Sequence, residues 1–242
     1  MADRDHARGE PRPLRVLLTN DDGIGAPGLA VLEAALPAGC SPTIVAPWEE
    51  RSACSHQVVT ARPLRPVRLG PRRVAVDAFP ADCVRLAFHE GWGPFDWVLA
   101  GVNHGANLGA DIYYSGTVAA AREAALLGIR AIAVSHFRDR LLDDSDWNRA
   151  RGWVRRVLPA LLSTPLGQGE YWNVNLPSLP SGPVDPPVVE CPVDTSPVQV
   201  RYSADGPERL YSGVYRERPR RVGSDVDVCF GGSIAVSRLS LP

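Results

Sequence analysis

The sequence LRVLLTNDDGIGAPGL, from Leu14 to Leu29, decides the fold. An apolar run leads directly into two adjacent carboxylates, Asp21 and Asp22, and then into glycines. Asn, Asp and Gly are common in turns, so a simple loop after a strand would explain these residue types. The alternative is a cation site, because ligands of open α/β sheets bind beyond the carboxyl ends of the strands. The rest of the chain has to distinguish these two interpretations.

Short apolar runs alternate with helical patterns downstream of this stretch. We predict buried strands at Arg15–Thr19, Pro42–Ala46, Trp97–Ala100 and Ala131–Ser135. We predict helices at Gly28–Leu36, Asp82–His89, Ser115–Gly128 and Trp147–Leu162. This alternation is typical of a Rossmann-like, doubly wound α/β fold with a mostly parallel sheet.

Composition divides the chain into three parts. We expect residues 1–13 to form a flexible tail, residues 14–190 the α/β catalytic domain, and residues 191–242 a β-rich C-terminal extension. Pro-rich sequence follows Tyr171, and the segment from Val193 to the end alternates short β-like runs with polar turns. We expect this segment to form an antiparallel arm outside the main sheet.

Charge and composition exclude several classes of protein. The 242 residues carry 26 basic and 27 acidic side chains, so a general nucleic-acid polymer is not an expected partner. No apolar run approaches the roughly 20 residues that span a bilayer, and the N-terminus lacks a signal-peptide core. We therefore expect a cytoplasmic protein without membrane contact. The five scattered cysteines contain no CxxC pair, which argues against a disulfide framework or a structural zinc site.

Polar side chains follow three of the predicted strands. Asp21 and Asp22 follow the first strand, Ser52 the second and Asn103 the third. Loops after neighbouring strands of a doubly wound sheet converge on one edge, so we expect these side chains to lie close together. Two carboxylates, a hydroxyl and an amide oxygen suit Mg²⁺, Mn²⁺ or Ca²⁺ and not zinc. The sequence predicts one divalent cation at this edge.

A second feature, the start of the Ala-rich helix, points to an anion. Ser115, Gly116 and Thr117 would offer free backbone N–H groups at the positive end of the helix dipole. A cation beside such a helix start indicates phosphate chemistry, in which Asp21 or Asp22 would activate water or attack phosphorus. The alternative is that Ser115 only caps the helix.

The remaining polar residues also have simpler explanations. Asn103 and Asn107 occur among glycines, as turn residues do. His56 and His104 are of a type that more often makes structural hydrogen bonds than catalyses proton transfer. Glu49–Arg51 is typical of a solvated charge run. The coincidence of polar groups at successive strand ends, however, favours a functional site.

These stretches together resemble the SurE family, the stationary-phase survival proteins, which are metal-dependent nucleoside monophosphate phosphatases. The resemblance rests on TNDDGIGAPGL, APWEERSACSH, PADCVRLAF, GVNHGANLGADIYYSGTVAAAREAALLGIRAIAVS, WNVNLP and GSDVDVCFGGSIAVSRLSLP. They occur in the order and spacing of the family and span almost the whole chain after the tail. The block from Gly101 to Ser135 is the most specific of them.

The resemblance assigns roles to individual residues. It implies that the metal ligands are Asp21, Asp22, Ser52 and Asn103, and that the phosphate contacts are Asn107, Ser115, Gly116 and Thr117. It also implies that Asp21 activates or delivers the nucleophile. The leaving alkoxide would take its proton from a bound water or from His104.

The family also has a C-terminal arm that is exchanged between subunits, which gives homodimers and sometimes tetramers. This chain departs from the family at Trp48, where Asp is usual, at Ala53, where Gly is common, and at Ala100, where Ser is more usual. The stretch from Tyr202 to Asp225 matches the family pattern only loosely. Substrate preference and oligomeric state therefore follow less directly from the resemblance than metal binding does.

Three hypotheses of function follow. The first is a divalent-metal-dependent phosphomonoesterase that hydrolyses nucleoside 5′- and 3′-monophosphates. The second keeps the chemistry and changes the substrate to a specialised phosphorylated metabolite, a sugar phosphate or a short polyphosphate. The third is a non-catalytic nucleotide- or phosphate-binding protein, against which the paired carboxylates argue, since they would repel an anion unless a cation lay between them. No GxGxxG follows the first strand, so dinucleotide binding is not expected.

Overall fold

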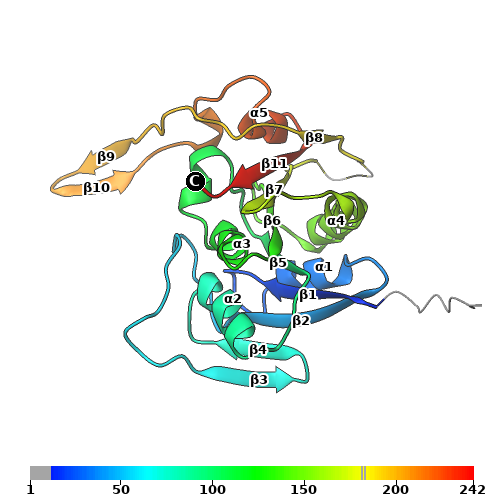
Figure 1. Cartoon of the computed structure of the whole chain (residues 1–242). Coiled ribbons are helices and arrows are strands. Elements are labelled where there is room, and N and C mark those ends of the chain that lie inside the picture. Colours follow the sequence, from blue (N-terminus) through cyan, green and yellow to red (C-terminus); the bar gives the residue numbers. More distant parts are fainter. Residues whose placement is uncertain (1–11, 181, 183) are drawn as a thin grey trace, which may run out of the picture.

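The computed structural model describes residues 12–180, 182 and 184–242, and within this range the chain forms a nine-stranded sheet with helices on both faces (Figure 1). The strand order is β3-β4-β2-β1-β5-β6-β7-β11-β8. The strands of this sheet are β1 Leu14–Thr19, β2 Cys40–Pro47, β3 Pro66–Gly70, β4 Arg73–Val76, β5 Trp97–Asn103, β6 Arg130–His136, β7 Glu170–Leu176, β8 Val188–Glu190 and β11 Ile234–Ser240. The predicted tail lies outside the described residues except for Arg12 and Pro13.

Five α-helices and two short 3₁₀ helices occur in the described part of the chain. They are α1 Pro27–Ala34, α2 Pro80–His89, α3 Gly116–Leu126, α4 Asp144–Ser163 and α5 Asp225–Phe230, with η1 Gly109–Tyr113 and η2 Tyr215–Glu217. The four predicted helices are confirmed, with ends that differ by a few residues. No described helix combines the length and the hydrophobicity that crossing a bilayer requires.

The centre of the sheet is parallel, as the alternation of strands and helices predicts. Strands β4, β2, β1, β5, β6 and β7 pair in parallel along the sheet. Strand β1 is buried on both faces, because Val16 and Leu18 pack in the core beneath α1 and α4 while Leu17 packs beneath α2 and α3. The carboxyl ends of β1, β2 and β5 therefore lie at one edge, and the loops that follow them meet there.

Helix α3 lies close against the sheet because its inner face is made of small residues. Ala120, Ala121 and Ala124 are fully buried against the β5–β6 region. The Ser115 hydroxyl accepts a hydrogen bond from the Val118 N–H at 3.0 Å, so Ser115 is the N-cap of the helix. The start of α3 is thereby fixed at the edge where the three loops converge.

The C-terminal segment corrects one expectation. We expected everything after Val193 to lie outside the main sheet, but β11 is a strand of that sheet, antiparallel to β7 and parallel to β8. The physical reason is burial: the side chains of Ile234, Ala235 and Val236 are almost fully covered in this position. Without β11, the backbone of β7 would form an open edge.

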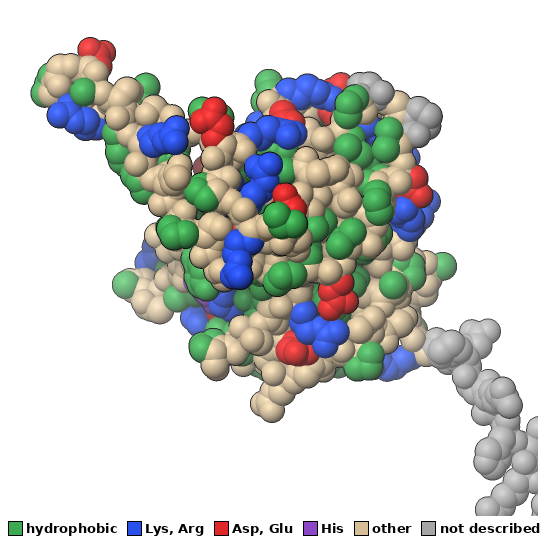
Figure 2. All heavy atoms as spheres, turned by 90° about the horizontal axis from the view of Figure 1, so that it is seen from above, with side chains coloured by type: hydrophobic (Ala, Val, Ile, Leu, Met, Phe, Trp, Pro, Cys, Tyr) green, Lys and Arg blue, Asp and Glu red, His purple; other side chains and the backbone are tan. Residues whose placement is uncertain are grey.

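A hairpin does leave the body of the protein, as expected of an arm. Strands β9 Tyr202–Asp205 and β10 Glu208–Tyr211 form a separate two-stranded antiparallel sheet. Figures 1 and 2 show this hairpin projecting away from the rest of the molecule. Its large apolar side chains, among them Tyr202 and Leu210, are exposed. Exchange of the hairpin between subunits stays a prediction.

Candidate active site

Hydrogen bonds donated by backbone N–H groups connect the loops that follow β1, β2 and β5. The Arg51 N–H donates to the carbonyl oxygen of Asp21 at 2.7 Å. The His104 N–H donates to Oδ2 of Asp22 at 3.0 Å. The polar ends of three separate strands are therefore held as one unit, as their positions in the sequence predict.

Asp21 is buried against the start of helix α3. Its Oδ1 accepts a hydrogen bond from the Thr117 hydroxyl. A side chain at position 116 would lie 3.0 Å from Oδ2 of Asp21 and 2.6 Å from Sγ of Cys54, so only glycine permits this close approach. Burial raises the pKa of Asp21, and the hydrogen bonds from Thr117 oppose that rise.

Asp22 lies beside Asp21 and is only partly buried. Burial raises the pKa of Asp22 to about 7, with the neighbouring charge of Asp21 as the next contribution. The hydrogen bond from the His104 N–H acts in the opposite direction. Two carboxylates in these positions are costly when both are ionised, and a bound cation would relieve the repulsion between them.

Ser52 and Asn103 bring neutral oxygen atoms to the same place. The Ser52 hydroxyl donates to Oε1 of Glu50 at 2.5 Å, and the Asn103 amide donates through Nδ2 to the carbonyl oxygen of Gly105 at 2.8 Å. The second bond fixes the Asn103 side chain and leaves Oδ1 as its remaining acceptor. A cavity of about 180 Å³ is lined by Asp21, Ser52, Ala53, Asn103, His104, Asn107, Asp111, Tyr114 and Ser115.

Asp22 faces a neighbouring hollow of about 400 Å³, which it shares with Trp48, Glu50 and Trp147. His104 lines both this hollow and the cavity of Asp21. Three of the four predicted metal ligands thus line one cavity, while the fourth, Asp22, lines the neighbouring hollow. Trp48, one of the departures from the family pattern, thus lines the same hollow as Asp22.

The predicted phosphate contacts have different positions. Asn107 and Ser115 line the cavity. The Thr117 hydroxyl instead donates a hydrogen bond to Asp21, and Gly116 leaves room for the Asp21 carboxylate. Asn107 is held firmly: its Nδ2 donates to Ser135 at 2.7 Å, and its N–H donates to Oδ1 of Asn175 at 2.8 Å. Asn107 and Ser115 are therefore the best-placed members of this set.

The two histidines differ sharply in their surroundings. His56 pairs with the buried carboxylate of Glu123, with 2.7 Å between Nε2 and Oε2, and does not line the cavity. Nε2 of His104 is buried and has no hydrogen-bond partner among the described residues. Burial lowers the pKa of His104, and the positive charge of Arg138 lowers it further. His104 alone thus remains a candidate for proton transfer.

Sequence reasoning missed several residues around the site. Glu50, which resembled part of a solvated charge run, bonds Ser52 and raises the pKa of both aspartates through its charge. Asn173 and Asn175 on β7 donate their amides to the carbonyl oxygen of Asn107. In the sequence, these two residues are indicated by the alternation in WNVNLP, which places two amides on one face of a buried strand.

The donor set fits a hard divalent cation. It combines two carboxylates with a hydroxyl and an amide oxygen, which are ligands typical of Mg²⁺, Mn²⁺ or Ca²⁺. Within the described ranges there is no group of three or more His, Cys, Asp or Glu side chains suited to hold a metal. A site in this chain therefore has to draw on neutral oxygens in addition to the two aspartates.

The chain is similar to known proteins in sequence and in fold. The sequence profile of the family described as Survival protein SurE matches residues 16–192. This chain belongs to the SurE family. The SurE crystal structure from Aquifex aeolicus superposes with a TM-score of 0.80 and 29% identity, covering 94% of each chain.

Relatives in the SurE family extend over most of the chain. A protein of Nostoc sp. is 45% identical over 226 residues, or 93% of this chain and 99% of its own length. A protein named 5′-nucleotidase SurE from Paramagnetospirillum magneticum is 37% identical over 238 residues, which cover 95% of this chain and 91% of the relative. A protein of the same name from Gemmatimonas aurantiaca is 47% identical over 169 residues, or 69% and 67% of the two chains.

Proposed function

We propose that this chain is a divalent-metal-dependent phosphomonoesterase that hydrolyses nucleoside 5′- and 3′-monophosphates to nucleoside and phosphate. It is a phosphoric monoester hydrolase, the class to which relatives named 5′-nucleotidase SurE belong. The observation that carries the proposal is the adjacent pair Asp21 and Asp22, with raised pKa values, beside the oxygens of Ser52 and Asn103.

Asp21, Asp22, Ser52 and Asn103 would hold one cation per subunit, Mg²⁺, Mn²⁺ or Ca²⁺. When bound, such a cation polarises a phosphoryl oxygen and lowers the pKa of a coordinated water. The protein itself contributes orientation. Asp21, which accepts a hydrogen bond from Thr117, would direct or deprotonate the attacking water, or attack phosphorus.

Other residues would bind the substrate and complete the proton transfer. Asn107 and Ser115 line the cavity and would contact the phosphate oxygens. The leaving alkoxide requires a proton, which either a water or His104 would supply. His104 is mostly neutral near pH 7 because its pKa is lowered, but the negative charge of a bound phosphate would raise that pKa and favour the donor form.

We also propose that the chain assembles into homodimers or tetramers, and the projecting hairpin supports this. Exposed apolar side chains on the arm, such as Leu210 and Tyr211, would be covered if the hairpin were exchanged with a second copy of the chain. Sedimentation of the full chain would measure this directly. A monomer at all concentrations would contradict the proposed exchange.

A substrate panel tests the activity. Purified protein with added Mg²⁺, Mn²⁺ or Ca²⁺ would be assayed for phosphate release from 5′- and 3′-nucleotides, sugar phosphates and short polyphosphates. We expect the nucleoside 5′-monophosphates to have the highest kcat/KM. Faster turnover of a sugar phosphate or polyphosphate would favour the second hypothesis, and nucleotide binding without hydrolysis would favour a binding protein.

A further inference from the structure

A large apolar hollow adjoins the candidate active site. It has a volume of about 760 Å³ and is lined by Gly105, Ala106, Phe137, Arg138, Asp139, Val214, Tyr215 and Arg216. Gly105 and Ala106 directly follow Asn103 and His104, which line the cavity of Asp21. A single loop therefore contributes residues to the lining of both spaces.

The sizes of the two spaces indicate how a substrate divides between them. The cavity at Asp21, of about 180 Å³, has room for a phosphate group but not for a whole nucleotide. Known small-molecule sites are roughly 300–1,000 Å³, a range that includes the adjoining hollow. The hollow beside Trp48 is the other neighbouring space, but the carboxylates of Asp22 and Glu50 face it.

Two aromatic side chains, Phe137 and Tyr215, line the large hollow, and the Arg216 guanidinium lies 5.1 Å from the centroid of the Phe137 ring. The ring of Phe137 stacks on Phe230 with centroids 4.7 Å apart, and the Tyr215 ring lies 5.8 Å from Phe137 at an interplanar angle of 31°. The Arg218 guanidinium lies over the Tyr215 ring, 5.0 Å from its centroid, but Tyr215 as a residue is 40% exposed and lines the hollow. A planar group that stacks on this ring would gain contact area at little cost in side-chain entropy.

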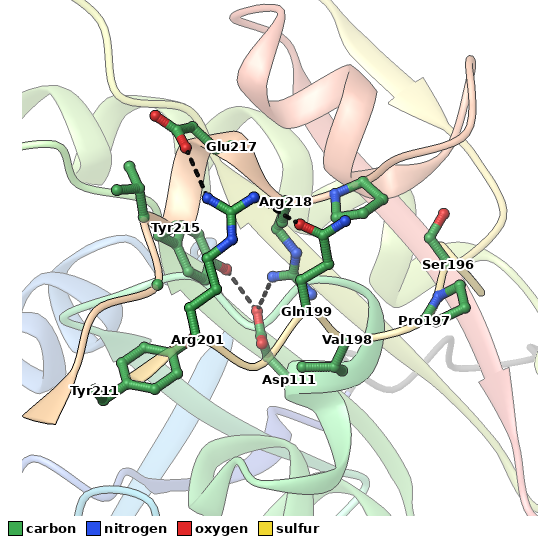
Figure 3. A pocket seen from close by; sticks show the side chains of 13 residues that line it. Asp111, Ser196, Pro197, Val198, Gln199, Arg201, Tyr211, Tyr215, Glu217 and Arg218 are labelled. Atoms are coloured by element: carbon green, nitrogen blue, oxygen red, sulfur yellow. Dashed lines mark hydrogen bonds and ion pairs between the residues drawn. The ribbon is translucent and has the colours of Figure 1, made fainter. Parts of the chain in front are cut away.

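Tyr215 is held in place by the active-site region itself. Figure 3 shows the Tyr215 hydroxyl and the Arg218 guanidinium converging on Asp111, with oxygen–oxygen and nitrogen–oxygen distances of 2.5 and 2.6 Å. Asp111 in turn lines the cavity of Asp21. The ring therefore keeps a defined position relative to the phosphate site.

The lining of the large hollow includes a positive charge without an ion-pair partner among the described residues. Arg216 pairs with Asp139, but Arg138 makes no ion pair in the part of the chain that the structure describes. The hollow thus combines aromatic side chains with the unpaired cation of Arg138, which directly follows Phe137 in the chain.

We propose that this hollow binds the planar aromatic part of a phosphomonoester substrate, stacked on Tyr215, with Arg138 contacting the polar atoms that link it to the phosphate. The inference rests on the proposed function and specifies its substrate class. A nucleobase and a simple aryl group share the chemistry that the hollow would recognise. Sugar phosphates lack it and would gain nothing from Tyr215.

The test compares Tyr215→Ala with Tyr215→Phe, which keeps the ring and loses only the hydroxyl. Tyr202→Ala, which removes an exposed aromatic ring from the β9–β10 hairpin outside the hollow, is the matched control. KM and kcat would be measured for adenosine 5′-monophosphate, an aryl phosphate and ribose 5-phosphate with the metal-loaded full chain. Binding of adenosine alone would be measured by calorimetry, which does not depend on catalysis.

We expect Tyr215→Ala to raise KM for adenosine 5′-monophosphate about tenfold and to weaken adenosine binding similarly, because one base–aromatic stack contributes roughly 1–3 kcal/mol. KM for ribose 5-phosphate should change less than twofold. Tyr215→Phe keeps the ring beside Phe137 but loses the hydrogen bond to Asp111, so its adenosine affinity should be closer to that of the wild type than to that of Tyr215→Ala. An effect on the aryl phosphate as well would show that any flat ring is accepted, and an effect on the nucleotide alone would show that the hollow is specific for the base.

Several results would overturn the proposal. These are an equal rise in KM for all substrates, unchanged adenosine binding in Tyr215→Ala, or loss of nucleotide preference in Trp48→Ala but not in Tyr215→Ala. If Tyr215→Ala alters the assembly state while adenosine binding is unchanged, the hollow serves a neighbouring subunit instead. A wild-type protein that binds adenosine through Tyr215 but releases no phosphate would contradict the proposed function and leave the hollow as a nucleoside site.

Discussion

The Thr117 hydroxyl donates a hydrogen bond to the carboxylate of Asp21 across 96 positions of sequence. Thr117 lies in the first turn of α3, and Asp21 follows β1. The bond therefore joins the helix start, which the sequence suggests as an anion site, to the carboxylate suggested as a metal ligand. In this arrangement the side chain of Thr117 orients Asp21, and the phosphate contact is left to its neighbours.

Removal of this hydroxyl should slow catalysis. A hydrogen bond to a charged group contributes about 1.5–3 kcal/mol, so Thr117→Val should lower kcat by roughly ten- to a hundredfold while the fold is retained. Thr117→Ser keeps the hydroxyl and should recover most of the rate. Steady-state kinetics with circular dichroism checks this, and normal turnover by the valine variant would contradict the assigned role.

Asp22→Asn should abolish stabilisation by metal. A ligand that binds only the folded state stabilises it by about 2.7 kcal/mol at a hundred times its Kd, so Mg²⁺ or Mn²⁺ should raise the Tm of the wild type. The variant should show no such rise. Asp205→Asn, an exposed carboxylate in the hairpin, should respond as the wild type does. Equal shifts in all three proteins would place the metal elsewhere.

Gly116→Ala tests the close approach of α3 to Asp21. Its new methyl group would lie 2.6 Å from Sγ of Cys54, and overpacking of this kind typically costs 1–3 kcal/mol. We expect both a lower Tm and a lower kcat, because the helix start must move away from Asp21. Gly152→Ala in α4 has nothing within 4 Å and should be stabilising instead. Unchanged activity in Gly116→Ala would show that the approach is not needed.

A buried histidine should make the protein sensitive to acid. His136 packs against Trp147 and Trp153, and burial lowers its pKa from 6.5 to about 4. Between these values the unfolded chain binds a proton that the folded chain does not. Folding stability should therefore be fully present above pH 6.5 and fall by about 3 kcal/mol as the pH drops towards 4.

His136→Phe keeps a ring of similar shape and cannot be protonated. Its free energy of unfolding, measured by denaturant titration, should vary less between pH 6.5 and pH 4 than that of the wild type. The same slope in both proteins would show that another group causes the acid sensitivity.

The sequence predicts elements whose pattern is local. Strand β1 and helix α3 follow from a continuous apolar run and from an Ala-rich stretch with a cap. Strand β7 is harder to predict, because Asn173 and Asn175 interrupt its apolar pattern and are buried only to hold Asn107. Strand β11 pairs with a strand that ends more than 50 residues earlier, and no local pattern specifies such a pairing.

In the candidate site, too, some features can be predicted from the sequence and others cannot. The order of strands and helices predicts that Asp21, Ser52 and Asn103 meet, because loops at one sheet edge must converge. Side-chain orientation cannot be predicted in this way. The bond from Thr117 to Asp21 and the position of Glu50 beside Ser52 depend on rotamers that only the packed structure determines.

Metal add-back tests the central claim most directly. The protein would be stripped of metal, and phosphate release from a nucleoside 5′-monophosphate would be measured before and after addition of Mg²⁺, Mn²⁺ or Ca²⁺, beside Asp22→Asn. We predict no release without metal, restored release with at least one of the three cations, and none from the variant under any condition. Release that persists without metal, or equal turnover by Asp22→Asn, would contradict catalysis by a cation held at Asp21 and Asp22.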